Sequence, residues 1–137
     1  MEIKASQVQV RYITIKYKIK DKLNRLCYML NITSCYIPCI ISCTLNLMDE
    51  YILKHYESIE EDIEKCNFRL SIITFACLWI STKFHDDNIL YGVDIEYVTH
   101  IKWNIIAKEE MKILDAIKYD IYKFMIEEEA VLSKLYL

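Results

Sequence analysis

The sequence predicts an all-α protein, and three observations carry this prediction. The chain has 137 residues with a single glycine and a single proline, whereas β-sandwiches and barrels need many turn residues. Apolar residues recur at helical spacing in several segments. The stretch 68–84 is almost wholly apolar and too long for an ordinary strand. A chain of this length is typical of one domain, so residues 1–137 are treated as a single domain.

Two helices are predicted in the first part of the chain. Residues 12–30 carry apolar side chains four, four, three and four positions apart, which form one stripe along a helix: Ile15, Ile19, Leu23, Leu26 and Leu30. A break is expected at 31–37. Pro38 suits the first turn of a second helix, because the N–H that proline lacks has no partner there. We expect that helix to continue toward Tyr56.

The central helix is predicted to follow a polar loop at 57–65, with Asn67 as its cap and its end near His85. Its apolar core, 72–80, is far shorter than the roughly 20 residues that cross a membrane. A helix that is apolar on nearly every face must then be surrounded by other helices. We therefore expect a helical domain built around this segment, with no membrane partner.

Three shorter elements complete the prediction. A turn at 86–92 is followed by a short helix at 94–100, and an amphipathic helix covers 107–118 with Met111, Leu114 and Ile117 on one face. Residues 127–137 are expected to form a closing helix. The chain is thus predicted to have five principal helices with an additional short element at each end.

The charge balance argues against nucleic acid as a partner. The net charge is −3 at pH 7, and nucleic-acid binders usually carry a basic patch. The alternating lysines near the N-terminus fit a solvated face or, alternatively, a surface for an anionic partner: Lys16, Lys18, Lys20 and Lys22.

Six cysteines occur in a chain whose first residues lack the apolar segment of a signal peptide. We therefore expect an intracellular protein, cytoplasmic or nuclear, with reduced thiols. Cys35, Cys39 and Cys43 repeat every four residues. This repeat is interpreted as small apolar residues on one helix face, and a metal-binding stripe is the alternative, although zinc sites favour closer pairs.

No catalytic constellation is found. The three histidines are scattered without metalloprotease spacing, and one glycine cannot build a phosphate-binding loop. The run His85-Asp86-Asp87 fits a solvated helix end better than an acid–base or metal cluster. We predict no enzyme activity, no cofactor and no metal.

Three segments, in order, resemble the motifs of a cyclin box. Residues 46–53 read Asn-Leu-Met-Asp-Glu-Tyr-Ile-Leu, similar to the pattern on the second cyclin helix. Residues 76–84 read Ala-Cys-Leu-Trp-Ile-Ser-Thr-Lys-Phe, similar to the small-residue third helix. Residues 110–121 read Glu-Met-Lys-Ile-Leu-Asp-Ala-Ile-Lys-Tyr-Asp-Ile, similar to the fifth. The resemblance covers about residues 15–125.

The resemblance implies a single five-helix cyclin-box domain with short flanking helices, and a regulatory subunit that forms a heterodimer with a cyclin-dependent protein kinase and activates or redirects it. Residues 67–70 together with 83–87 look closest to the phosphate-response type of cyclin. The abundance of Ile, Lys, Tyr and Asn would suit a cyclin encoded by a large DNA virus.

The resemblance also implies a kinase-binding surface. Lys83 and Glu110 match the lysine and glutamate with which cyclins hold the kinase. The apolar family positions on the same surface match five further residues: Phe84, Ile80, Leu114, Tyr119 and Ile121. Each has a structural alternative. Lys83 also suits the negative end of a helix, Glu110 suits a solvated face, and core packing competes for the apolar positions, above all for Ile80 and Leu114.

The chain departs from the cyclin pattern at the substrate-docking motif of the first helix. The best match is 15–19, where lysine replaces arginine, and the following tryptophan is absent, so that docking groove is not predicted. The second five-helix repeat is missing as well. The other function considered is a non-cyclin helical interaction protein, such as a viral apoptosis- or signalling-regulator bundle. Only the cyclin interpretation requires Lys83 and Glu110 to meet on one surface.

Overall fold

The computed structural model describes residues 5–56, 62–85 and 90–121. Within these ranges the chain forms five α-helices and two short turns: α1 (Gln7–Met29), a 3-10 turn η1 (Ser34–Tyr36), α2 (Ile37–Glu50), a π-helical turn η2 (Tyr51–His55), α3 (Ile63–His85), α4 (Gly92–Thr99) and α5 (Trp103–Ala116). No residue in the described ranges is in a β-strand. The all-α prediction is confirmed.

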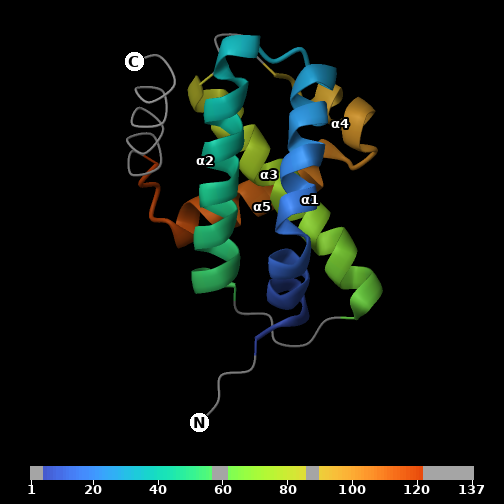
Figure 1. Ribbon diagram of the computed structural model, residues 1–137, viewed down its shortest axis with the longest axis vertical. Coiled ribbons are helices and arrows are strands. Elements are labelled where there is room, and N and C mark those ends of the chain that lie inside the picture. The colour runs from blue at the N-terminus through green and yellow to red at the C-terminus, as the bar shows by residue number, and fades with distance from the viewer. Residues whose placement is uncertain (1–4, 57–61, 86–89, 122–137) are drawn as a thin grey trace.

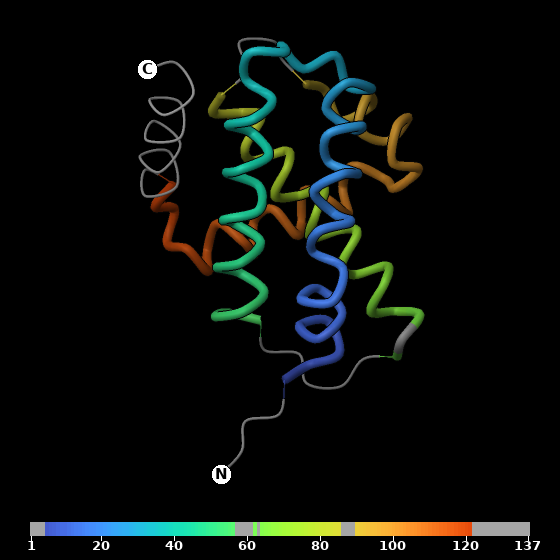
Figure 2. Tube along the Cα trace, in the orientation of Figure 1, coloured from blue at the N-terminus to red at the C-terminus, as the bar shows by residue number. Residues whose placement is uncertain are grey.

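The helices are arranged around α3. Figure 1 shows α1 and α2 running antiparallel beside each other, with α3 passing behind both of them and α5 crossing behind α3. The trace in Figure 2 shows the same order, and α4 lies at the end of α1 that is farther from the N-terminus. Helix α3 packs against α1, α2 and α5, so three helices cover the apolar segment that the sequence singles out.

Burial along α3 confirms that it is the central helix. Nearly every residue from 70 to 82 is buried, on all faces of the helix. Small polar residues let α2 approach closely: the Thr44 hydroxyl donates to the Ile40 carbonyl at 2.6 Å, and its oxygen lies 3.1 Å from the Ser81 Oγ on α3. No helix in the described part of the chain has the length and apolar character needed to cross a lipid bilayer.

Helices α1, α3, α4 and α5 all start earlier than predicted, and α1 and α3 show why. Helix α1 begins at Gln7 because Ser6 and Gln9 form a capping box: the Ser6 Oγ accepts from the Gln9 N–H at 3.1 Å, and the Ser6 N–H donates to the Gln9 Oε1 at 2.9 Å. Helix α3 begins at Ile63, so the prediction that Asn67 caps it is wrong. Asn67 lies inside the helix, where its Oδ1 accepts a hydrogen bond from the Arg11 Nε.

The end of α5 is shaped by two consecutive left-handed residues. Lys118 and Tyr119 have φ angles of 56° and 58°, a conformation that side chains with a Cβ adopt at a cost of about 1–2 kcal/mol each. The chain turns sharply there. Tyr119 is exposed, while Ile121 returns to the core. The helix predicted at 127–137 lies outside the described residues.

Candidate protein-binding site on α3 and α5

Lys83 and Glu110 meet across two helices. The Lys83 Nζ lies 2.5 Å from the Glu110 Oε1, although the residues are 27 positions apart in the chain. Lys83 is in the last turn of α3, and Glu110 is in the middle of α5. The spatial requirement of the cyclin interpretation, that these two side chains lie together, is met.

The two partners are unequally accessible. The Lys83 side chain is 45% exposed, whereas that of Glu110 is 10% exposed. The carboxylate is therefore largely covered by protein, and the ammonium is the group that solvent or another protein can reach. A charged pair with one open side can still donate to an incoming acceptor, because an ammonium has three N–H donors.

A second partner of Lys83 lies one turn earlier on α3. The Lys83 Nζ is 4.3 Å from the centre of the Trp79 ring, well inside the range of a cation–π interaction. Trp79 is itself buried in the core cluster. The ammonium is thus held between an indole face and a carboxylate.

Glu109, the neighbour of Glu110, forms a deeper ion pair on the same face of α3. The Arg69 Nη2 lies 2.9 Å from the Glu109 Oε2, and the Glu109 side chain is only 3% exposed. Arg69 also lies 5.8 Å from the ring centre of Tyr56, which packs edge-on against Tyr51. We call Tyr51, Tyr56, Arg69 and Glu109 the Arg69 cluster. It joins η2, α3 and α5.

Burial dominates the protonation equilibria in this cluster. Loss of solvation raises the pKa of Glu109 above its ordinary value, although the Arg69 guanidinium opposes that rise. Burial and the neighbouring Glu109 carboxylate also raise the pKa of Tyr51 to about 12. The alternative considered for Glu110, a solvated helix face, is wrong, because Glu110 is buried.

The predicted apolar site residues divide into two groups. Phe84 and Tyr119 are 49% and 55% exposed. Ile80 and Ile121 are buried in the core, and Leu114 is partly buried against it. Core packing, the alternative considered for Ile80 and Leu114, agrees with their positions, so the exposed apolar contribution comes from the two aromatic rings.

A second polar contact joins α1 to α2. The Lys16 Nζ lies 2.8 Å from the Asp49 Oδ2, and the Tyr12 hydroxyl donates to the other oxygen of Asp49. Lys16 is the lysine that replaces the arginine of the cyclin docking motif, and in this chain it serves as the ion-pair partner of α2.

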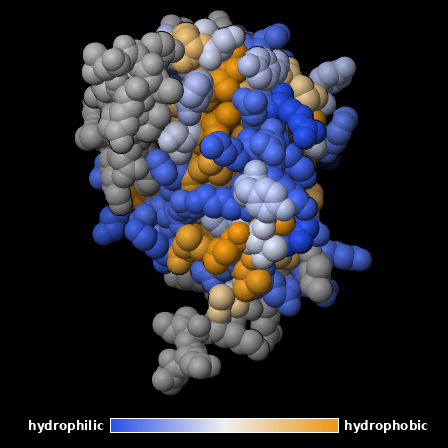
Figure 3. Space-filling view, viewed as in Figure 1, coloured by the Kyte–Doolittle hydropathy of each residue, from blue (hydrophilic) through white to orange (hydrophobic). Residues whose placement is uncertain are grey.

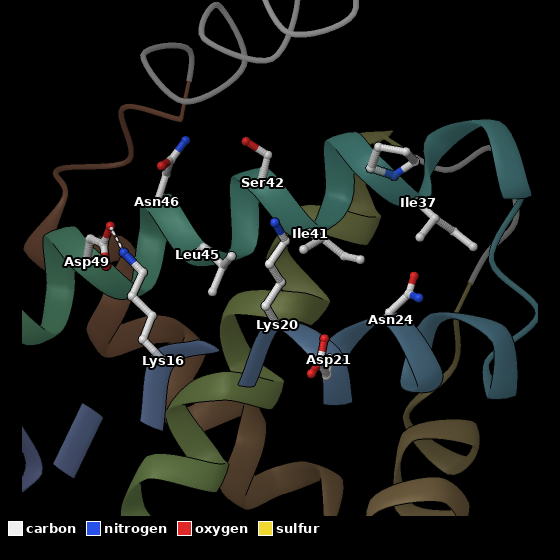
Figure 4. A pocket seen from close by; sticks show the side chains of 11 residues that line it. Lys16, Lys20, Asp21, Asn24, Ile37, Ile41, Ser42, Leu45, Asn46 and Asp49 are labelled. Carbon is white, nitrogen blue, oxygen red and sulfur yellow. Dashed lines mark hydrogen bonds and ion pairs between the residues drawn. The ribbon is translucent and has the colours of Figure 1, made fainter. Parts of the chain in front are cut away.

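A cavity of about 580 Å³ lies beside this contact, between α1 and α2. Figure 4 shows Lys20 extending from α1 toward Ser42 on α2, over Ile41 and Leu45. In Figure 3 an apolar stripe runs between hydrophilic side chains on the face where α1 and α2 are nearest the viewer. The cavity therefore has an apolar floor and a polar rim of both charge signs.

Another cavity, of about 500 Å³, lies between α1 and α3. Its floor is apolar, with Ile15, Ile19 and Leu70 among the lining residues, and Arg11, Lys22 and Arg25 are the charged residues along it. Lys18, Lys20 and Lys22 are exposed, which agrees with the solvated-face interpretation of the lysine run.

The cysteines follow their predicted role with one exception. Cys39 and Cys43 are buried on α2, as expected for small apolar residues, whereas Cys35 is exposed in η1. Within residues 5–56, 62–85 and 90–121, no group of three or more His, Cys, Asp or Glu side chains is arranged to hold a metal ion. Asp86 and Asp87, which the sequence analysis considers with His85 as an acid–base or metal cluster, lie outside the described residues.

Sequence reasoning missed the role of Trp79 and the pairing of Arg69 with Glu109, and it placed Met111 on the wrong face of its helix. The contact of Trp79 with Lys83 could be predicted from the sequence, because residues four positions apart on a helix are neighbours on its surface. The pairing of Arg69 with Glu109 had no local signal, since the residues are 40 positions apart. Met111 follows Glu110 and is exposed, which its assignment to the apolar face of α5 did not anticipate.

Comparison with known protein families gives one match. The family model described as "Cyclin, N-terminal domain" matches residues 3–122, a range that includes α1 to α5 and the Lys83–Glu110 pair. No curated protein and no solved structure matches the chain.

Proposed function

The chain belongs to the cyclin family, and from this membership we propose that it is the regulatory subunit of a cyclin-dependent protein kinase. It has no chemistry of its own in this proposal. It binds the kinase catalytic domain and changes the populations of that domain's conformations. The kinase phosphorylates its substrates, and the cyclin-like chain determines when the catalytic site is assembled.

The observation that carries the proposal is the contact between Lys83 and Glu110. These two residues match the family positions that bind the kinase, and their side chains lie 2.5 Å apart on α3 and α5. A shared surface of this kind fits a partner that presents backbone carbonyls or carboxylates to the exposed ammonium. The aromatic rings of Phe84 and Tyr119 are exposed, and aromatic anchors are enriched at protein interfaces.

The proposed mechanism is a population shift. A kinase domain is active only when the glutamate of its mobile helix reaches the ATP-binding lysine. A protein that binds the active arrangement more tightly than the inactive one increases the active population by its differential affinity. We propose that Lys83, Glu110, Phe84, Tyr119 and the partly buried Leu114 supply this differential contact. Ile80 and Ile121 support the surface from the core.

Kinase binding is tested by capture on purified, immobilised cyclin-dependent kinases, followed by measurement of histone phosphorylation by each captured complex. We expect at least one kinase to bind in a 1:1 complex. Lys83→Ala should weaken that binding by about 2–5 kcal/mol, because a charged pair desolvated at an interface loses one member. Glu110→Ala should act in the same direction.

Lys108→Ala is the matched control. Lys108 is an exposed lysine on the same helix as Glu110, so its removal changes the net charge by the same amount as Lys83→Ala without touching the pair. Unchanged kinase capture by both Lys83→Ala and Glu110→Ala would reject the proposed surface. Capture without increased phosphorylation would mean that the chain sequesters the kinase instead of activating it.

Three finer assignments are part of the proposal. The phosphate-response class is proposed from residues 67–70 and 83–87, and a viral origin from the residue composition. An intracellular location is proposed because cyclin-dependent kinases act there.

A further inference from the structure

We propose that Trp79 is a positioning residue that fixes the ammonium of Lys83 against Glu110, and that it thereby sets the geometry in which a kinase meets that ammonium. The effect on kinase binding rests on the proposed function, but the contact of Lys83 with Trp79 and Glu110 is a property of the free chain. Trp79 does not match any of the residues that the cyclin resemblance assigns to kinase binding.

The geometry supplies the first argument. The Lys83 Nζ lies 4.3 Å from the centre of the Trp79 ring and 2.5 Å from the Glu110 Oε1. Trp79 is four residues before Lys83, so the lysine side chain turns back along α3 over the indole. Two contacts on different helices, α3 and α5, then hold one ammonium group.

Exposure gives the second argument. The Lys83 side chain is 45% exposed, and an exposed lysine ordinarily samples many rotamers, which makes a surface ion pair weak. Binding a partner through a mobile ammonium requires that freedom to be lost on association. An indole face that holds the ammonium beforehand reduces this loss.

The third argument comes from the indole N–H. Trp79 is 8% exposed, and its Nε1 has no hydrogen-bond partner among the described residues. A buried donor without an acceptor is unfavourable, and an aliphatic side chain at this position would avoid that penalty. Packing alone therefore does not favour tryptophan here. The ring face toward Lys83 provides what leucine does not, because tryptophan forms the strongest cation–π contacts.

The orientation of the ammonium follows. One of its three N–H donors serves Glu110, and the indole covers another side, so the remaining donor is the one available to a partner's oxygen. Trp79 acts through Lys83 in this arrangement. It does not itself need to touch the kinase.

The test uses tryptophan with increasing fluorination, which weakens the negative ring face with little change in shape. The full-length chain is prepared with ordinary, monofluorinated, trifluorinated and tetrafluorinated tryptophan. A parallel series in the Trp79→Leu variant reports any contribution from Trp103, the other tryptophan of the chain. Two quantities are measured: the affinity for a purified cyclin-dependent kinase that the unmodified chain captures, and the NMR signal of the Lys83 ammonium protons in the free chain.

We expect the affinity to fall stepwise with fluorination, about 3-fold to 30-fold over the series, which corresponds to about 0.7–2 kcal/mol at 1.4 kcal/mol per tenfold change. The Lys83 ammonium protons should exchange faster with water in the same order. The melting temperature of the free chain should stay nearly constant, and the Trp79→Leu series should show no trend.

A merely structural role for Trp79 gives a different result, because packing does not depend on the charge distribution of the ring. Constant kinase affinity across the fluorinated series would overturn the proposal. An exchange rate of the Lys83 ammonium protons that does not change with fluorination would overturn it as well. If no kinase binds the unmodified chain, the proposed function fails. The exchange series then decides separately whether Trp79 holds the ammonium.

Discussion

Arg69 and Lys83 lie fourteen positions apart on α3, and two adjacent glutamates of α5 bind one each. Glu109 bonds to Arg69 at 2.9 Å, and Glu110 bonds to Lys83 at 2.5 Å. Fourteen residues correspond to about 21 Å of helix, so the contacts hold α5 across α3 from both directions. The crossing of the two helices is therefore fixed by charge as well as by apolar packing.

Of these two ion pairs, the more deeply buried one, Arg69–Glu109, should contribute more to stability. Arg69→Ala leaves the Glu109 carboxylate buried without its cation, so we expect the free energy of unfolding to fall by about 3–5 kcal/mol. Urea denaturation followed by circular dichroism measures the change. The exposed Arg25→Ala is the matched control, and it should change stability by less than about 0.5 kcal/mol.

The double variant Arg69→Met with Glu109→Leu should recover most of that loss. It replaces both charges by apolar side chains, so neither is left buried alone, and such replacements are often neutral or stabilising. A double variant as unstable as Arg69→Ala would show that the pair itself, and not the stranded carboxylate, holds the Arg69 cluster together.

The raised pKa of Glu109 predicts a pH dependence of a definite sign. In the folded chain the carboxyl holds its proton to a higher pH than in the unfolded chain, where its pKa is near 4.5. Its contribution to stability is therefore fully present below pH 4.5 and is lost as the pH rises through the folded pKa. Glu109→Gln should remove this component, so the unfolding free energies of the two proteins should diverge as the pH rises from 4.5. A pH-independent difference would contradict the raised pKa.

The unequal burial of Lys83 and Glu110 predicts unequal effects on the free chain. Lys83→Ala leaves a largely buried carboxylate without its partner and should cost about 1–3 kcal/mol. Glu110→Ala leaves an ammonium that water can reach, and it should cost less than about 1 kcal/mol. Thermal and urea unfolding of both variants, compared with Lys108→Ala, measure the difference. Equal costs would mean that the carboxylate is better hydrated than its burial indicates.

The cysteines predict a simple chemical readout of the fold. Cys35 is exposed, and the other five cysteines are buried, with burial raising the pKa of Cys27 to about 11 and that of Cys77 well above its ordinary value. A thiol reagent should therefore modify one cysteine quickly in the native chain and all six in denaturant. Cys35→Ser should abolish the fast phase. Fast reaction at several sites would contradict the packing of α2 and α3.

Much of the fold could be predicted from the sequence, because helical periodicity and apolar content act locally. The central position of α3 followed from a segment that is apolar on every face. The starts of α1 and α3 were predicted less well. The start of α1 is set by the Ser6–Gln9 capping box, which lies before the apolar stripe that predicts the helix. Asn67 resembles a cap in sequence, although its side chain contacts Arg11 on another helix.

Only those site residues could be predicted whose identity and position match a known family pattern. Lys83 and Glu110 were found through a family pattern, and no local property of the chain brings them together. The burial of Glu109 depends on Arg69, a residue 40 positions away, and a sequence pattern on α5 alone describes both glutamates as solvated. Pairings of this kind are decided by how α5 crosses α3, and that crossing becomes visible only in three dimensions.

The left-handed turn after α5 places bulky residues where the backbone conformation favours glycine. Glycine adopts that conformation without the steric cost of a Cβ, so backbone energy alone would favour glycine at position 118 or 119. The chain keeps Lys118 and Tyr119 there, and the strained backbone directs the tyrosine ring into solvent while Ile121 returns inward. Replacement of Tyr119 by glycine would therefore relax the backbone at that corner and remove its outward-facing ring.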